Sequence, residues 1–193
     1  MPLSLVLAST SPYRKELLAR LQLPFTTDAP NVDETALPEE TPSSLVQRLS
    51  LLKAQALMPR HPNSLIIGSD QVAVCQGRII TKPGSHANAV AQLTSFSEQR
   101  IEFLTGLCVL NALTGESQIL LEPYNVYFRQ LSQDTIEKYL IKERPYNCAG
   151  SFKSEGLGTV LFERLEGDDP TALIGLPMIR LIQLLKYFKF PIL

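Results

Sequence analysis

The sequence predicts an α/β fold with a mixed sheet, and two observations support this prediction. Segments typical of strands and of helices alternate along the 193 residues. Two long extended stretches, 101–110 and 118–129, are joined by Thr114-Gly115 and indicate a hairpin or neighbouring strands. Because consecutive parallel strands need a crossover connection, this pair argues against a purely parallel sheet.

The first strand and helix are marked clearly. Leu5, Val6 and Leu7 predict a buried strand. Ser11 is a good N-cap, and Pro12 suits the first helical position because its missing N–H would have no partner there. The helix that follows has one face at a spacing of four residues: Tyr13, Leu17 and Leu21.

Two basic residues, Arg14 and Lys15, stand in the first turn of this helix, where acids are preferred. Two cations, nearby hydroxyls and free amides at a helix start are typical of an anion site, most simply for phosphate. The alternative is that both side chains only point into water. The sequence leaves both interpretations open.

The remaining elements follow in chain order. Short strands are expected at 25–27, 65–67, 72–75, 78–81 and 159–165. Thr41-Pro42 opens a helix that stops before Pro59, 85–96 is a weaker helix, Ser132 caps another, and Pro177 opens the last. A proline-containing loop, 28–42, carries Val32-Asp33-Glu34, and a loop of small residues spans 148–158.

Two charged residues are out of place for a core. Asp70 interrupts an apolar strand run, and Gly68-Ser69-Asp70 is either a turn or part of a site. Lys53 shares a helix row with Leu49 and Leu57, so it either extends to solvent from the edge of that face or has a buried partner.

Composition excludes several classes of protein. A formal net charge of −1 provides no general basic field for nucleic acid. Three widely spaced cysteines indicate free thiols in a reducing compartment. No apolar stretch is long enough to span a bilayer, and the short N-terminal run lacks the preceding basic residue of a signal peptide. We therefore expect a cytoplasmic protein that binds neither membrane nor nucleic acid.

A series of motifs runs along the chain in this order: LASTSPYRKELL, VDE, the Lys53-Ala54 pair, IIGSDQV, TKP, TGL, CAGSFKSEG and ERLEGDDPTALIGLP. Together they resemble the Maf-like nucleotide pyrophosphatases, most closely the bacterial 7-methyl-GTP pyrophosphatase branch. The resemblance covers nearly the whole chain and implies a single domain over 1–193. The implied fold is Maf/ITPase-like, with an elongated mixed β-sheet flanked by helices and two lobes around a central cleft.

The resemblance also implies an activity: cleavage of a nucleoside triphosphate to the monophosphate and diphosphate with a divalent metal cation, Mg²⁺ or Mn²⁺. Asp70 matches the family's catalytic proton acceptor, and Glu34 is a reasonable second acid at the metal beside Asp70. The positions that match phosphate binding are Ser9, Arg14, Lys15, Lys53 and Lys82. Lys15 stands where many members have arginine, so it keeps the charge without the bidentate fork.

Base preference is assigned by the same resemblance to Tyr13, Gln71 and Glu155, where the branch acting on dTTP and UTP has arginine, threonine and glutamine. A carboxylate can accept the N–H donors of a guanine edge, and an aromatic ring can stack on the cationic 7-methylated purine. The branch usually has tryptophan at the Tyr13 position, so tyrosine is a mild departure. Packing beside Leu17 is the alternative role for Tyr13.

The expected function is therefore hydrolysis of 7-methyl-GTP to 7-methyl-GMP and diphosphate, which keeps modified nucleotides out of the pool. The same chemistry on dTTP, UTP or another nucleotide is the nearer alternative. A non-catalytic regulator of septum formation is the alternative from another class. The oligomeric state is open, with a homodimer as one possibility.

Overall fold

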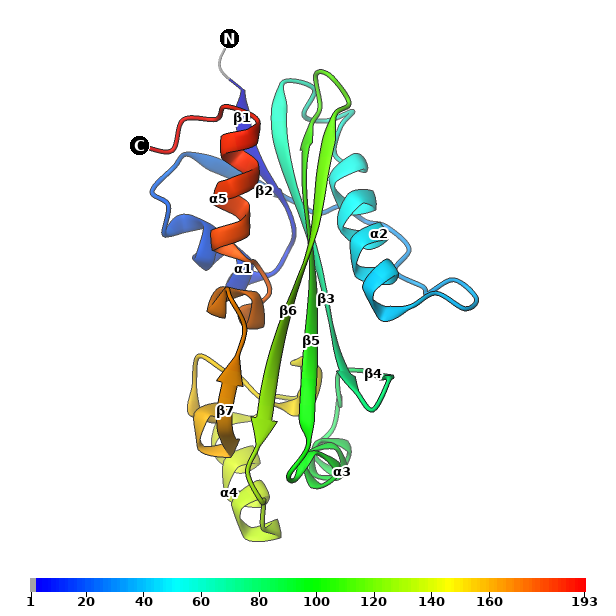
Figure 1. Cartoon of the computed structure of the whole chain (residues 1–193), viewed down its shortest axis with the longest axis vertical. Helices are drawn as coiled ribbons and strands as arrows, with labels where there is room; N and C mark the ends of the chain where they lie inside the picture. The colour runs from blue at the N-terminus through cyan, green and yellow to red at the C-terminus, as the bar shows by residue number, and fades with distance from the viewer. Residues whose placement is uncertain (1–2) are drawn as a thin grey trace. The chain divides into compact units, whose positions relative to one another are not determined.

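The computed structural model describes residues 3–193 and contains one mixed sheet of seven strands in the order β2-β1-β3-β5-β6-β7, with β4 paired to β3 (Figure 1). The strands are β1 (Ser4–Ala8), β2 (Phe25–Asp28), β3 (Ser64–Cys75), β4 (Arg78–Ile80), β5 (Arg100–Asn111), β6 (Ser117–Phe128) and β7 (Phe162–Glu166). The α-helices are α1 (Pro12–Ala19), α2 (Pro42–Gln55), α3 (His86–Phe96), α4 (Gln133–Glu143) and α5 (Met178–Tyr187). The short 3₁₀ helices are η1 (Ala149–Ser151), η2 (Leu157–Leu161) and η3 (Pro170–Ile174).

The chain divides into two compact units. Unit 1 comprises the residues up to Gln71 together with Thr105–Glu122 and Asp169–Leu193, and unit 2 comprises Val72–Leu104 and Pro123–Asp168. The long strands β3, β5 and β6 each contribute residues to both units. The expectation of one domain over 1–193, and that of a central cleft, stay predictions.

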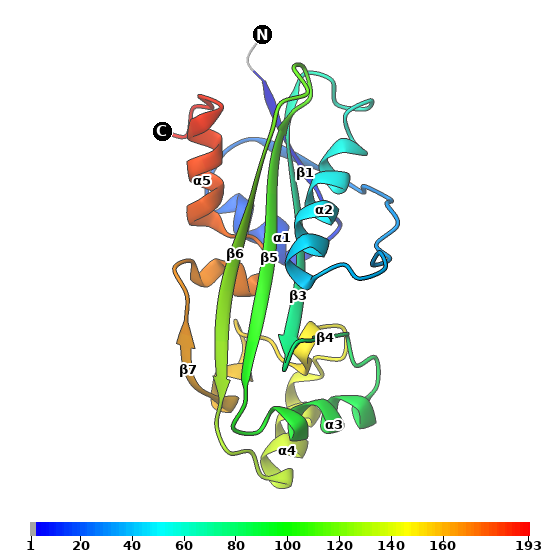
Figure 2. The same cartoon turned by 45° about the vertical axis from the view of Figure 1, so that its right-hand side comes forward.

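In unit 1 the strand β1 pairs in parallel with both β2 and β3. Its alternating side chains enter two separate cores, because successive residues of a strand point to opposite faces. Leu5 and Leu7 pack with buried residues of α1 and α5, whereas Val6 and Ala8 pack with Ala54 of α2. Figures 1 and 2 show the same division, with α2 on one side of these strands and α1 and α5 on the other.

Two glycines let α2 approach the sheet closely. A Cβ atom on Gly68 of β3 would lie 2.0 Å from the carbonyl oxygen of Ser50, and one on Gly106 of β5 would lie 2.3 Å from that of Val46. The Ser50 hydroxyl donates to the Val46 carbonyl at 2.6 Å and accepts the backbone N–H of Asp70 at 3.0 Å. This contact fixes the distance between the middle of α2 and the Asp70 segment of β3.

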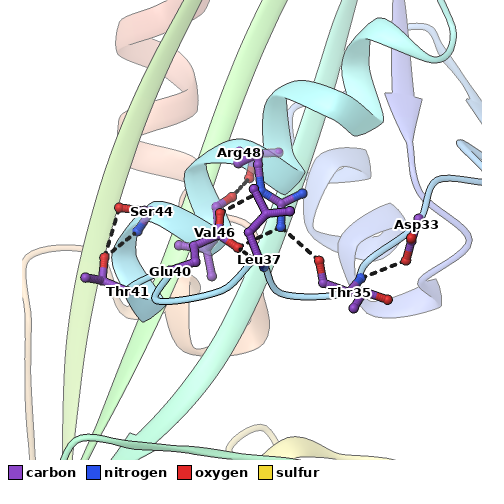
Figure 3. A network of polar contacts seen from close by, with 9 residues as sticks. Asp33, Thr35, Leu37, Glu40, Thr41, Ser44, Val46 and Arg48 are labelled. Carbon is purple, nitrogen blue, oxygen red and sulfur yellow. Dashed lines mark hydrogen bonds and ion pairs between the residues drawn. The ribbon is translucent and has the colours of Figure 1, made fainter.

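The loop before α2 is attached to that helix by a half-buried ion pair (Figure 3). Nε and Nη2 of Arg48 donate to the two oxygens of Glu40 at 2.6 and 2.7 Å, and Nη2 also reaches the carbonyl of Thr35 at 3.0 Å. The same Glu40 carboxylate accepts the backbone N–H of Leu37. Together these bonds order residues 35–40 against the first turns of α2.

Unit 2 has a core of phenylalanine rings. Phe128 of β6 contacts Phe96, Phe152 and Phe162 edge-on or tilted, with ring centroids 5.4 to 5.7 Å apart. The strand β7 pairs antiparallel with β6. The start of α3 is joined to α4 through His86, whose two ring nitrogens contact Tyr146 and Glu137 at 2.9 and 2.8 Å.

Most expected elements are present, and the caps at Ser11, Thr41, Ser85 and Ser132 each accept the amide three residues ahead. Two expectations were wrong. Residues 68–71 do not separate two strands, because β3 runs unbroken from Ser64 to Cys75. The expected strand 159–165 starts later, since η2 occupies 157–161. Among residues 3–193, every helix is too short or too polar to cross a membrane.

The close packing of α2 predicts that Gly68→Ala destabilises the protein by about 2–3 kcal/mol, because the new methyl group must push the helix away from β3. The free energy of unfolding in urea, followed by circular dichroism, measures this effect. Gly77→Ala is the control: its Cβ would meet nothing within 4 Å, and only its φ of 77° is unfavourable, at a cost of about 1 kcal/mol. Equal losses in both variants would contradict the packing explanation.

The ion pair of Figure 3 predicts a stability that depends on pH. The hydrogen bonds from Arg48 lower the pKa of Glu40 from 4.5 to about 2. A lowered carboxyl pKa stabilises the fold above the unfolded value, and this contribution disappears as the pH falls toward the folded value. Glu40→Gln should therefore lower Tm at neutral pH and converge with the parent protein near pH 2.

Thermal melts between neutral pH and about pH 2 test this expectation. The double variant Glu40→Gln/Arg48→Gln should show the same pH dependence as Glu40→Gln, since the pair is already broken in the single variant, and only a pH-independent loss from the Arg48–Thr35 bond should be added. A Tm difference that stays constant across the whole range would show that the pair does not act through ionisation of Glu40.

Candidate active site

The start of α1 has the features of an anion-binding helix terminus. The side chain of Ser11 caps the helix by accepting the N–H of Arg14, and no acidic residue stands in the first turn. Ser9 is buried between β1 and α1, and its hydroxyl accepts the backbone N–H of Ser11 at 3.1 Å. Lys15 is exposed on the same turn. The start of α1 therefore carries positive charge with no acidic residue in the first turn to balance it.

Arg14 is held in one orientation by the backbone of a distant segment. Its Nε donates to the carbonyl of Gly175 at 2.8 Å, and the same oxygen accepts the hydroxyl of Ser69 at 3.0 Å. Gly175 has a φ of 113°, which favours glycine, and a Cβ there would lie 3.4 Å from Nε of Arg14. Because Nε is committed to this carbonyl, the terminal nitrogens of Arg14 are the groups left to bind a ligand.

Burial lowers the pKa of Arg14, while the nearby charges of Asp70 and Glu34 act in the opposite direction. Arginine stays protonated in proteins, so the guanidinium of Arg14 is a cation at neutral pH. A partly desolvated cation of this kind binds an anion more strongly than a solvated one would.

The segment that holds Gly175 is itself fixed by a fully buried carboxylate. Asp169 accepts the backbone N–H and the hydroxyl of Thr171 at 3.0 and 2.5 Å, and the N–H of Ile179 at 2.6 Å. The bond to Ile179 caps α5, whose N-cap residue is proline and has no side chain that can accept. Asp169 therefore joins η3 to α5 and sets where the Gly175 carbonyl lies.

Lys53, Asp70 and Glu34 form the charged centre of unit 1. Nζ of Lys53 lies 2.6 Å from Oδ1 of Asp70 and 2.8 Å from Oε1 of Glu34. The side chain of Lys53 is 7% exposed and that of Asp70 is 10% exposed, whereas Glu34 is 59% exposed on its loop. Lys53 thus has one buried and one exposed partner, and the edge-of-face interpretation of this lysine is wrong.

Successive side chains of β3 point to opposite faces of the sheet, so the side chain of Asp70 lies on the other face from those of Ser69 and Gln71. Asp70 lies on the side of α2, whereas Ser69 and Gln71 bond to the η3–α5 segment on the other side. Nε2 of Gln71 donates to Oγ1 of Thr105 at 3.0 Å and to the carbonyl of Ala172 at 2.6 Å. Because a backbone carbonyl can only accept, the amide is fixed with Oε1 as its remaining ligand-binding atom.

The structure brings Arg14, Lys53, Asp70 and Glu34 together by contact or by mutual electrostatic effect. In the described part of the chain no hydrogen bond or ion pair joins Ser9, Tyr13 or Lys15 to this group. Tyr13 is 37% exposed, so part of its side chain is accessible, and both stacking on a base and packing stay predictions for it. Lys82 and Glu155 are exposed residues of unit 2, where Glu155 accepts the hydroxyl of Ser154.

Sequence reasoning missed the residues that position this group: Ser50, Ser69, Thr105, Asp169 and Gly175. Most of them act through backbone carbonyls or amides, which leave no trace in spacing or charge. The one available signal was the polar and glycine content of the IIGSDQV, TGL and GDDPTALIGLP motifs.

Comparison with known proteins gives a consistent result. The model of the family described as Maf-like protein matches residues 4–188. A protein named 7-methyl-GTP pyrophosphatase from Nitrosococcus oceani is 54% identical over 192 residues, which cover 100% of this chain and 96% of that protein. A protein of the same name from Colwellia psychrerythraea is 57% identical over 183 residues, or 95% and 92% of the two chains.

Among solved structures, the Ham1 protein of Staphylococcus aureus superposes with a TM-score of 0.52 over 96% of this chain and 99% of its own, at 13% identity. That likeness concerns the fold alone, and it agrees with the expected Maf/ITPase-like architecture. The family match over residues 4–188 and the full-length relatives confirm the resemblance inferred from the motifs. This chain belongs to the Maf-like protein family.

Proposed function

We propose that the protein is a nucleoside triphosphate pyrophosphatase that hydrolyses 7-methyl-GTP to 7-methyl-GMP and diphosphate. The observation that carries this proposal is the similarity, at 52–57% identity over 94–100% of the chain, to relatives that bear the name of this activity. The charged group of unit 1 supports it independently, because two cations beside two carboxylates suit a metal-bound polyphosphate.

In the proposed mechanism Asp70 is the general base. Its carboxylate orients a water molecule and accepts its proton as the water oxygen attacks the α-phosphoryl group. The bond to the bridging oxygen breaks, and the diphosphate leaves with the electron pair. Lys53 and Arg14 stabilise the charge that grows on the phosphoryl oxygens and on the leaving diphosphate.

The donor set of unit 1 fits a magnesium or manganese ion. Within residues 3–193 no group of three His, Cys, Asp or Glu side chains gathers as a metal site. Asp70 and Glu34 nevertheless converge on one nitrogen, and Mg²⁺ usually takes only one or two carboxylates beside water and phosphate oxygens. Asp70 and Glu34 would hold the ion, which would neutralise phosphate charge when bound.

Further phosphate contacts are proposed for Ser9, Lys15 and Lys82. Ser9 and Lys15 flank the first turn of α1, whose amides and positive end favour an anion. Lys82 belongs to unit 2 and precedes α3, and its exposed side chain is accessible to a ligand. Their contribution is to fix the position of the triphosphate and to balance its charge.

The base is proposed to be read by Tyr13, Gln71 and Glu155. The exposed ring of Tyr13 offers a face for stacking on the cationic 7-methylguanine. Gln71 offers only its Oε1, because Thr105 and Ala172 occupy its amide nitrogen, and Glu155 offers carboxylate oxygens. These acceptor oxygens can pair with the N–H donors of guanine, whereas they cannot pair with a base edge that presents only acceptors. We also place the protein in the cytoplasm and leave its oligomeric state open, with a homodimer as one possibility.

A panel of triphosphates tests the function directly. With Mg²⁺ or Mn²⁺ present, diphosphate release should be fastest, as kcat/KM, for 7-methyl-GTP, and a chelator should stop it. A clear preference for dTTP or UTP would show that the substrate is not 7-methyl-GTP but that the reaction is the one proposed. No release from any triphosphate would overturn the enzymatic proposal and favour the non-catalytic alternative.

Asp70→Asn should lower kcat by about a hundredfold to ten-thousandfold, because the amide cannot accept the proton from water. Circular dichroism should show an unchanged fold, since an asparagine side chain is nearly the same size as an aspartate. Asp33→Asn is the matched control: it changes a carboxylate next to Glu34 that accepts the N–H of Thr35, a bond that an amide oxygen can also accept. Full activity in Asp70→Asn would remove Asp70 from the mechanism.

The triple variant Tyr13→Arg/Gln71→Thr/Glu155→Gln should shift the preference from 7-methyl-GTP toward dTTP and UTP. The change removes the stacking ring and replaces two acceptors with groups that can also donate. The ratio of kcat/KM values for 7-methyl-GTP and UTP is the measurement. An unchanged ratio with intact turnover would show that base preference is set elsewhere.

A further inference from the structure

Lys53 occupies the place where the oxygens of the two metal-holding carboxylates converge. Its Nζ lies within 2.8 Å of both Asp70 and Glu34, and its side chain is 7% exposed. An ammonium group and a metal cation compete for the same carboxylate oxygens. A metal ion that takes the two oxygens now held by Lys53, Oδ1 of Asp70 and Oε1 of Glu34, must therefore displace the lysine from them.

The charges of this group already balance. Arg14 and Lys53 contribute two positive charges, and Asp70 and Glu34 contribute two negative charges. A divalent ion entering alone would add two positive charges to a poorly solvated region, where like charges repel strongly. A metal–triphosphate complex is net negative, and its phosphate oxygens offer Lys53 and Arg14 new partners.

The backbone segments that carry the two carboxylates are held by contacts that do not involve Lys53. The backbone N–H of Asp70 donates to Ser50, which lies on the same helix as Lys53. The loop that carries Glu34 is attached to α2 by the Arg48–Glu40 pair. The lysine can thus turn away to a phosphate while the backbone segments that carry both carboxylates keep their positions beside α2.

We propose that Lys53 is an exchangeable counter-ion that couples metal binding to triphosphate binding, so that the ligand of this site is the metal–triphosphate complex and not the free metal ion. This inference rests on the proposed function and specifies the chemical form of its substrate. Coupling of this kind is reciprocal: the triphosphate strengthens metal binding by the same factor as the metal strengthens triphosphate binding.

Titration with Mn²⁺ alone, followed by the electron paramagnetic resonance signal of the free ion, tests the proposal without any turnover. Lys53→Met should bind Mn²⁺ at least about tenfold more tightly than the parent protein, since the competing ammonium is gone. Lys138→Met is the matched control, because it also removes a lysine from a carboxylate, Asp134, but in an exposed pair of unit 2. Equal Mn²⁺ affinity in the parent protein and Lys53→Met would overturn the proposal.

A measurement on the parent protein keeps the test valid if Lys53→Met does not fold. The side-chain ¹⁵N signal of Lys53, assigned by its loss in Lys53→Arg, reports where the ammonium lies. Mg²⁺ alone should leave this signal in place, and Mg²⁺ with the α,β-methylene analogue of 7-methyl-GTP should shift it. A shift with Mg²⁺ alone at the same concentration would show that the metal displaces Lys53 unaided. Neither experiment depends on diphosphate release, so failure here is separate from failure of the proposed function.

Discussion

A buried lysine held between two carboxylates is the interaction on which the chemistry of unit 1 depends. Lys53 and Asp70 are both buried, and each is the partner of the other, since an isolated buried charge would be strongly unfavourable. Their contact requires α2 to lie almost against β3, which is why Gly68 and Gly106 face the helix. The close approach of α2 to β3, the Lys53–Asp70 ion pair and the proposed chemistry therefore depend on one another.

The alternation of β3 explains how one short motif performs several tasks. On the α2 side, Gly68 admits the helix and Asp70 meets Lys53. On the other side, Ser69 and Gln71 bond to the η3–α5 segment, whose Gly175 carbonyl holds Arg14. Arg14 of α1 and Lys53 of α2 are thus both positioned through contacts with β3, on its two opposite faces. This explains why the polar residues of IIGSDQV stand inside a buried strand without breaking it.

Much of the fold could be predicted from the sequence because its signals are local. Caps such as Ser11 and Ser132, the hairpin at Thr114-Gly115 and the helical rows all depend on near neighbours. The break expected at residues 68–71 failed for a non-local reason, since turn-forming residues were kept in the strand by bonds to α2 and η3. Sequence also singled out Lys53 and Asp70 as misplaced, but their pairing needed the register of a helix on a sheet. Asp169 and Thr105 could not be found, because their partners are mainly backbone groups.

The fold by itself does not specify the activity. The likeness to the Ham1 protein of Staphylococcus aureus, at 13% identity, concerns the fold alone, whereas the family match over residues 4–188 comes from the sequence. A crystal structure with Mg²⁺ and the α,β-methylene analogue of 7-methyl-GTP is the most direct test of the role given to the charged group. The expected result is a triphosphate bound to Lys53 and Arg14, with the metal on Asp70. A nucleotide bound elsewhere, with Lys53 still between Asp70 and Glu34, would contradict this account.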